Sequence, residues 1–168
     1  MGKITIRGTI RGLSADEVFR RIAAFPDYPG MCEAVRRVDL IEADDQHMVT
    51  DWEVNFHRGI LRWKERAEFR PEEGLIPFTE VDGDVDEFTG YWKVEERPDG
   101  HVTVAFFVSF DIGIPTLEHI LDPIAEEALY DNVASILTGL MGDAVTVEPP
   151  EYQSGGADRP RLDSVIIK

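Results

Sequence analysis

One carboxylate of the chain occupies a position where acid–base chemistry is expected. Glu65 lies in a stretch that alternates apolar and polar residues, which is typical of a β-strand. Alternation places Glu65 on the same face as Trp63 and Ala67, and places the neighbouring cations on the other face. A carboxyl group among buried apolar side chains loses hydration, its pKa rises toward neutrality, and it can act as a general acid or base. The alternative is a position at the sheet edge, or a pairing with Arg66.

Aromatic side chains at strand spacing predict an apolar wall around that carboxylate. Trp52, Val54 and Phe56 share one face of the preceding strand, so Trp52 and Trp63 are expected to be cross-strand neighbours that sandwich a planar ring. The other predicted wall positions are Phe78, Glu80, Trp92, Phe106 and Phe110. Each of them alone is equally well explained as core, and Glu80 as the solvated end of a strand. Together they exceed what one helix can cover, so we predict a ligand tunnel.

Three further side chains are candidates for contacting a ligand. Tyr28 lies among prolines near the expected tunnel mouth, where its hydroxyl donates to a ligand carbonyl or simply faces solvent in a turn. Asn132 borders the apolar stripe of a predicted helix, where its amide binds a ligand or a strand carbonyl. His119 lies in a predicted loop over the cavity and is a candidate general base.

The remaining chemistry-bearing residues argue against metals, cofactors and disulfides. The 4 histidines, His47, His57, His101 and His119, have no partner at ligand spacing, so no metal site is predicted. The single cysteine, Cys32, excludes an internal disulfide. The acidic stretch 80–87 resembles a calcium loop only in its charge, and we interpret it as a solvated loop.

The charge balance limits the partners. Asp and Glu number 33 against 17 Lys and Arg, which gives a net charge of -16. Phosphate backbones and anionic membranes need clustered cations, so neither nucleic acid nor a membrane surface is an expected partner. No apolar run approaches the length of a membrane span, and the first residues lack the apolar region of a secretory leader. We therefore expect a cytoplasmic protein, a monomer or a homodimer.

Hydrophobic periodicity predicts the elements that must position these residues. A length of 168 residues indicates one domain, which we assign to 1–142, with a partly disordered tail over 143–168. After a first strand over 4–10, Ser14 and Glu17 form a capping box that begins a helix, and a second short helix is expected over 31–35. Six antiparallel strands follow, over 38–41, 49–56, 60–69, 76–81, 88–95 and 102–110.

A long amphipathic helix closes the pattern. Asp122 is the expected N-cap with Pro123 at the first helical position, and apolar residues continue at helical spacing to Leu140. One helix cannot cover a flat sheet of seven strands. We therefore predict an α+β fold in which the sheet curls around the C-terminal helix and leaves an apolar cavity.

Three stretches in this order carry a resemblance to a known family: 14–19 with 25–29, then 35–42, and 110–136. They resemble the START-like, helix-grip superfamily called SRPBCC, in its polyketide cyclase/dehydrase and coenzyme Q-binding branch, over roughly residues 3–142. The resemblance implies an apolar tunnel for a lipophilic molecule. The bacterial aromatase/cyclases hold a poly-β-ketone there and guide ring closure or dehydration, with arginines inside the tunnel, whereas here alternation places Arg62 and Arg66 outside.

Three functions follow as hypotheses. The first is a polyketide cyclase, aromatase or dehydratase that receives its substrate from an acyl carrier protein and moves protons with Glu65. The second is a non-catalytic carrier of a quinone or another lipophile. The third is a protein-interaction module whose acidic face binds a basic partner.

Overall fold

The computed structural model describes residues 2–56, 59–113 and 118–152. Most of these residues belong to one antiparallel sheet and one long helix. The elements are β1 Gly2–Ile10, α1 Ala15–Ala23, η1 Phe25–Gly30, β2 Val35–Ala43, β3 His47–Phe56, β4 Gly59–Glu68, η2 Pro71–Glu73, β5 Leu75–Gly83, β6 Glu87–Glu96, β7 Val102–Asp111, α2 Glu118–Met141, η4 Gly142–Ala144, β8 Val145–Val147 and β9 Glu151–Tyr152.

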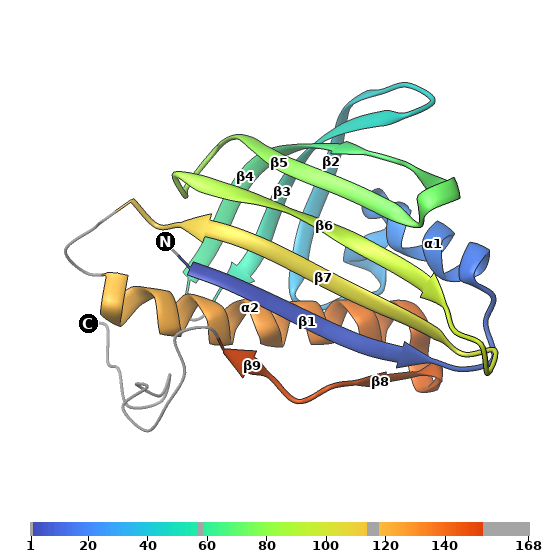
Figure 1. Cartoon of the computed structure of the whole chain (residues 1–168). Coiled ribbons are helices and arrows are strands. Elements are labelled where there is room, and N and C mark those ends of the chain that lie inside the picture. Colours follow the sequence, from blue (N-terminus) through green and yellow to red (C-terminus); the bar gives the residue numbers. More distant parts are fainter. Residues whose placement is uncertain (1, 57–58, 114–117, 153–168) are drawn as a thin grey trace.

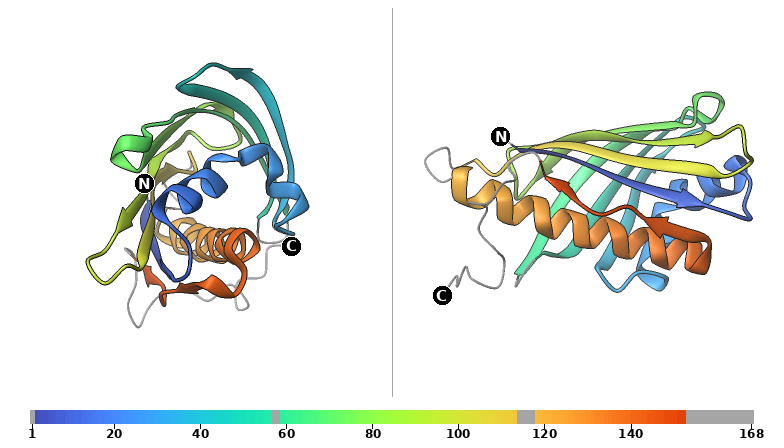
Figure 2. Two further views of the ribbon diagram at one scale, coloured as in Figure 1. Left: turned by 90° about the vertical axis from the view of Figure 1, so that its right-hand side faces the viewer. Right: turned by 60° about the horizontal axis from the view of Figure 1, so that its bottom comes forward.

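The sheet wraps around α2. Its strand order is β2-β3-β4-β5-β6-β7-β1-β8, and β9 also pairs with β1. Figure 1 shows α2 running along the concave face of the sheet, with α1 near its C-terminal end. The end-on view in Figure 2 shows the sheet curling around the helix. The predicted α+β helix-grip fold is confirmed, with the short strands β8 and β9 added to the seven predicted ones.

Strand alternation builds the core as expected. On β1, Ile4, Ile6 and Ile10 are buried, and β7 buries every second residue from Val102 to Phe110. These two strands pair antiparallel, with Ile6 opposite Phe106. Burial of one face on each strand fixes the register, because a slip by one residue would turn the apolar face to water.

The N-terminal helices differ in part from the predictions. Ser14 accepts a hydrogen bond from the backbone N–H of Glu17 at 3.1 Å, as expected for an N-cap. The Glu17 carboxylate pairs with Arg20 and Arg21 instead of returning to Ser14, so the reciprocal half of the predicted capping box is wrong. The second helix is also misplaced, because residues 25–30 form the 3₁₀ helix η1 around two prolines and residue 35 already begins β2.

Helix α2 begins earlier than predicted. It starts at Glu118, so Pro123 lies inside the helix and Asp122 is not its N-cap. Pro123 is the sixth residue of α2, beyond the four N–H groups that a helix start leaves unpaired, so it removes one backbone hydrogen bond from the second turn. Asp122 is buried and so is Glu126, one turn further on, and both have interaction partners.

The beginning of the predicted tail is ordered. Val145–Val147 forms β8 against Gly8–Ile10. Two backbone hydrogen bonds extend this pairing at its ends. The N–H of Arg11 donates to the carbonyl of Ala144 at 3.0 Å, and the N–H of Glu148 donates to the carbonyl of Arg7 at 2.8 Å. The tail that we predict to be partly disordered over 143–168 thus contains two short strands, at 145–147 and 151–152. These strands satisfy backbone groups on the outer side of β1, which a sheet edge leaves unpaired. The rest of the predicted tail, 153–168, lies outside the described residues.

Candidate functional site

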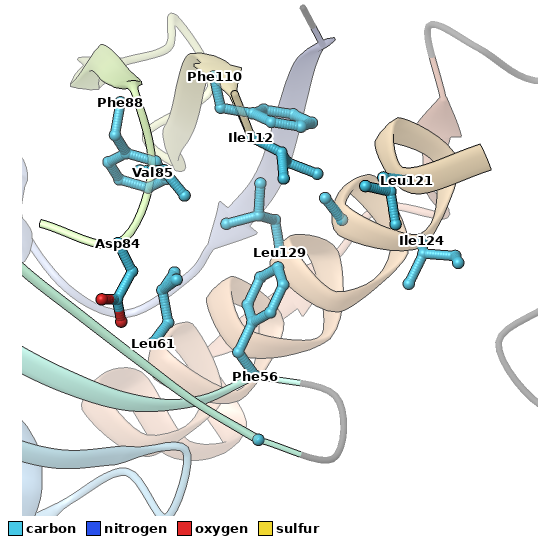
Figure 3. A pocket seen from close by; sticks show the side chains of 12 residues that line it. Phe56, Leu61, Asp84, Val85, Phe88, Phe110, Ile112, Leu121, Ile124 and Leu129 are labelled. Carbon is cyan, nitrogen blue, oxygen red and sulfur yellow. The ribbon is translucent and has the colours of Figure 1, made fainter. Parts of the chain in front are cut away.

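Two adjoining apolar cavities lie between the sheet and α2. The outer chamber has a volume of about 440 Å³ and lies beside the first turns of α2. It is lined by Phe56, Gly59, Leu61, Asp84, Val85, Phe88, Phe110, Ile112, Leu121, Ile124, Ala125 and Leu129 (Figure 3). The inner chamber has a volume of about 60 Å³. It is lined by Tyr28, Trp52, Val54, Phe56, Leu61, Trp63, Glu65, Phe78, Phe88, Trp92, Phe106, Leu129, Asn132, Val133 and Ile136.

Four side chains separate the two chambers. Phe56, Leu61, Phe88 and Leu129 line both of them. Figure 3 shows Phe56 on its strand and Leu129 on α2 pointing into the same space. The two chambers therefore adjoin along α2 at these four residues, and we call them together the tunnel. Its outer part lies in the volume range of small-molecule sites.

Glu65 lies where alternation predicted, on the inner face of β4. Its side chain is 5% exposed, and the cations Arg62, Lys64 and Arg66 are exposed on the opposite face. The strand is interior to the sheet, between β3 and β5, so neither the edge position nor a pairing with Arg66 occurs. Burial raises the pKa of the Glu65 carboxyl group to about 8. At neutral pH this group is mainly the neutral acid.

The indole of Trp63 modulates that carboxyl group. Its N–H lies near enough to Glu65 to favour the charged form, which opposes the larger effect of burial on the pKa. The same N–H is buried and forms no hydrogen bond of normal geometry. It acts on the pKa of Glu65 as a side-chain hydrogen-bond donor, but the contact falls short of a well-formed hydrogen bond.

The two tryptophans stack on each other. Trp52 and Trp63 are directly opposite in the β3–β4 register, with ring centroids 5.5 Å apart and an interplanar angle of 7°. No ligand ring fits between rings in mutual contact, so the predicted sandwich is wrong. The Trp52 N–H donates to the hydroxyl of Thr50 at 2.7 Å, and Thr50 is fully buried.

Tyr28 lies at the inner end of the tunnel, not at its mouth. Its hydroxyl donates to the carbonyl of Ile22, and its ring meets Trp52 edge-on at 5.6 Å. Burial raises the pKa of Tyr28 well above its ordinary value, and the charges of Cys32 and Glu65 add to this effect. The hydroxyl therefore stays protonated and is committed to anchoring η1 against α1.

The other polar candidates have structural positions. Asn132 lines the inner chamber, but its Nδ2 donates to the carbonyl of Asn55 at 2.9 Å and ties α2 to β3. Glu80 is paired opposite Glu65 in the β4–β5 register and is half-buried, yet it lines neither chamber. Burial, with Asp82, Asp86 and Asp84, raises its pKa. His119 belongs to the first turn of α2, not to a loop, and its side chain lies outside the described part of the chain.

The predicted aromatic wall is present, and sequence reasoning missed its other half. Trp52, Val54, Phe56, Trp63, Phe78, Trp92 and Phe106 line the inner chamber, and Phe110 lines the outer one. The prediction does not include the outer-chamber positions on α2 or in the acidic stretch 80–87, namely Leu121, Ile124, Ala125, Leu129 and Val85. The signal for Val85 is an apolar residue among acids. The α2 residues belong to an apolar stripe, which does not distinguish a cavity wall from packed core.

Metal-type clusters and membrane-spanning helices are both absent from the described part of the chain. No three His, Cys, Asp or Glu side chains among its residues are grouped so that they could hold a metal ion. None of its helices is long and apolar enough to cross a membrane.

Comparison with known proteins places this geometry in a family. Residues 12–137 match the family model described as polyketide cyclase/dehydrase and lipid transport. The chain belongs to this family. No curated protein sequence matches it. The resemblance inferred from the sequence is thereby confirmed at the level of the family.

Solved structures share the fold at low sequence identity. Protein TTHA0849 from Thermus thermophilus has 19% identity and a TM-score of 0.75, covering 83% of this chain and 94% of that one. The ZhuI aromatase/cyclase from Streptomyces sp. R1128 has 17% identity and a TM-score of 0.73, covering 84% and 92%. A START superfamily protein from Mycobacterium smegmatis has 12% identity and a TM-score of 0.71, covering 84% and 97%. Such identities establish the fold, not the chemistry.

Proposed function

We propose that this family member is a cyclase, aromatase or dehydratase of poly-β-ketone substrates. The observation that carries the proposal is a buried carboxylic acid, Glu65, at the inner end of an apolar tunnel, without an ion-pair partner among the described residues. The tunnel holds a flexible chain in a folded conformation, so that carbons distant along the chain come within bonding distance. The family that the chain belongs to, described as polyketide cyclase/dehydrase and lipid transport, supports this choice of chemistry.

The pKa of Glu65 fits both halves of an aldol condensation. As the neutral acid, Glu65 protonates the carbonyl oxygen that is attacked, or the hydroxyl that leaves as water. As the carboxylate, it removes a proton from a carbon next to a carbonyl, and the electron pair of that C–H bond forms the new C–C bond. A group whose pKa lies near the working pH is populated in both forms, which is what general acid–base catalysis requires.

A short triketone tests the proposal. In 1-phenylhexane-1,3,5-trione, attack of C6 on the C1 carbonyl followed by loss of one water gives 5-phenylresorcinol, whereas attack by an enol oxygen gives a pyrone. We expect the wild-type protein to accelerate carbocycle formation and Glu65→Gln to lose most of that acceleration while binding is retained. The matched control is Glu68→Gln on the same strand, because Glu68 lines neither chamber. Equal rates for the wild type and Glu65→Gln would overturn the catalytic role.

One observation favours a carrier as the second candidate. Most of the tunnel volume lies in the outer chamber, where the only ionisable lining residue among those described is Asp84. Its carboxylate accepts the backbone N–H of Arg62 at 2.8 Å and is therefore engaged within the protein. A carrier would bind the triketone or a quinone and release it unchanged, with the same affinity in Glu65→Gln. The interaction-module hypothesis predicted no sizeable cavity, and a volume of about 440 Å³ argues against it.

A further inference from the structure

The two stacked indoles of the inner chamber differ in one respect. The N–H of Trp52 donates to Thr50, whereas that of Trp63 forms no hydrogen bond of normal geometry. Trp63 is only 8% exposed, and its N–H lies close to the carboxyl group of Glu65. Buried donors in folded proteins are nearly always paired, so an unpaired one requires an explanation. Because Trp63 lines the inner chamber, an acceptor that enters this chamber can pair with the free N–H.

A second donor lies beside the first. Glu65 is two residues further along β4, on the same face, and lines the same chamber. Its carboxyl group forms no salt bridge within the described ranges and is mainly protonated at neutral pH, because burial raises its pKa to about 8. A protonated carboxyl group donates through its O–H. Two donors therefore border one small apolar space.

We propose that the indole N–H of Trp63 and the carboxyl O–H of Glu65 together bind one carbonyl oxygen of the ligand. This inference deepens the proposed function and rests on its ligand tunnel. A carbonyl oxygen has two lone pairs and accepts both hydrogen bonds at once. When the carbonyl carbon is attacked, negative charge develops on that oxygen, and both donors bind it more strongly than in the ground state.

The volumes define the class of ligand. The inner chamber, with about 60 Å³, admits only a small head such as an acetyl group, whereas the outer chamber, with about 440 Å³, admits a ring system. An anionic carboxylate head is disfavoured because the neighbouring cations of β4 face the opposite side of the sheet and do not compensate its desolvation. The ligand is therefore a neutral apolar molecule that ends in a ketone.

A pair of isosteric probes tests whether Trp63 and Glu65 bind a carbonyl oxygen. 2-Acetylnaphthalene carries a ketone, and in 2-isopropenylnaphthalene a C=CH₂ group replaces the C=O. We expect the wild-type protein to bind the ketone roughly tenfold more tightly at pH 7, the gain of pairing a buried donor. Infrared spectra of the bound ketone should show the C=O stretch shifted to lower frequency than in hexane, as two hydrogen bonds require. Above pH 8 the preference should fall, because the carboxylate of Glu65 only accepts hydrogen bonds.

Variants assign the effect to the two donors. Trp63→Phe keeps an aromatic ring but removes the free N–H, so the ketone preference should drop several-fold. Trp52→Phe is the matched control because it disturbs the same ring stack but removes an N–H that is already paired with Thr50. In Trp52→Phe we expect the affinities for the ketone and for the alkene to fall together, so that their ratio stays as in the wild type. Glu65→Gln retains an amide donor, so it should keep the preference and lose its pH dependence.

The outcomes separate this inference from the proposed function. If both probes bind with nearly equal affinity and the bound ketone shows no infrared shift, the proposed pair of donors is overturned and the apolar tunnel remains. That is also the result if water fills the inner chamber and cannot be displaced. Binding of neither probe would overturn the tunnel and the receptor together. The infrared measurement uses the wild-type protein, so it decides the question even if Trp63→Phe does not fold.

Discussion

At the scale of single residues, Glu65 makes the stability of the protein depend on pH in an unusual direction. Its pKa is raised from 4.5 to about 8 in the folded state. Between these values the folded state holds a proton that the unfolded state has released, so the free energy of unfolding falls as pH rises. We expect Glu65→Gln, which does not titrate, to gain stability relative to the wild type by on the order of 4 kcal/mol between pH 4.5 and 9. Denaturant unfolding at several pH values measures this, and parallel curves for the two proteins would contradict it.

The residue scale also shows what the sequence reveals about the site. Strand periodicity alone placed Glu65 and most of the aromatic and aliphatic wall residues on the inner face, because side chains on a strand must alternate. Periodicity does not report rotamers. It therefore missed that Trp52 and Trp63 stack on each other, and that the hydroxyl of Tyr28 and the amide of Asn132 are used by backbone carbonyls.

At the scale of elements, Gly139 determines how closely α2 approaches the segment after η1. A Cβ at this position would collide with the carbonyl oxygen of Met31 and lie 3.0 Å from the sulfur of Cys32. Alanine normally stabilises a helix by about 1 kcal/mol relative to glycine. Here we expect Gly139→Ala to destabilise the protein by about 1–3 kcal/mol, because backbone must move. The control is Thr138→Ala, at an exposed position one residue earlier, which should leave the stability unchanged or raise it. An increase in the Tm of Gly139→Ala would disprove the close packing of α2 at this position.

Strand β8 is the element that sequence reasoning did not find. Its three residues, Val145–Val147, are too few to show the periodicity of a strand. Their pairing also depends on β1, which lies more than a hundred residues earlier in the chain. A chain ending after Gly142 loses the hydrogen bonds that cover the outer edge of β1. We expect it to be less stable and more prone to aggregation than a chain ending after Tyr152, because an open edge strand pairs with other chains. Thermal unfolding with light scattering compares the two, and equal behaviour would contradict a structural role for β8.

At the scale of the whole molecule, the tunnel should be open to ligand at the end where α2 begins. Ala125 lines the outer chamber and is 2% exposed, whereas Ala134, on the same helix, lines a surface groove beside Met31. A saturating apolar ligand at a hundred times its Kd stabilises the folded state by about 2.7 kcal/mol. We expect 2-acetylnaphthalene to raise the Tm of the wild type and of Ala134→Trp but not of Ala125→Trp, whose indole fills the chamber. An equal rise in all three proteins would place the ligand elsewhere.

The overall fold was predictable because its constraints are global. Seven amphipathic strands and one long apolar helix leave only a curled sheet around the helix as a way to bury both. The ends of elements were less predictable, since Pro26 lies in the 3₁₀ helix η1, which begins at Phe25, and Pro123 lies within α2 instead of starting it. A proline fixes one dihedral angle, which suits either position.

The central claim is that the inner end of this tunnel holds a neutral carboxylic acid at physiological pH, and infrared difference spectroscopy tests it most directly. Spectra of the wild type minus Glu65→Gln, recorded from about pH 5 to 10, isolate the C=O stretch of this one carboxyl group. We predict a protonated-carboxyl band that is present at pH 6, absent in the variant, and lost with a midpoint near pH 8, the pKa of Glu65. A band that disappears below pH 5 would show an ordinary solvated carboxylate and would contradict the proposed acid–base site.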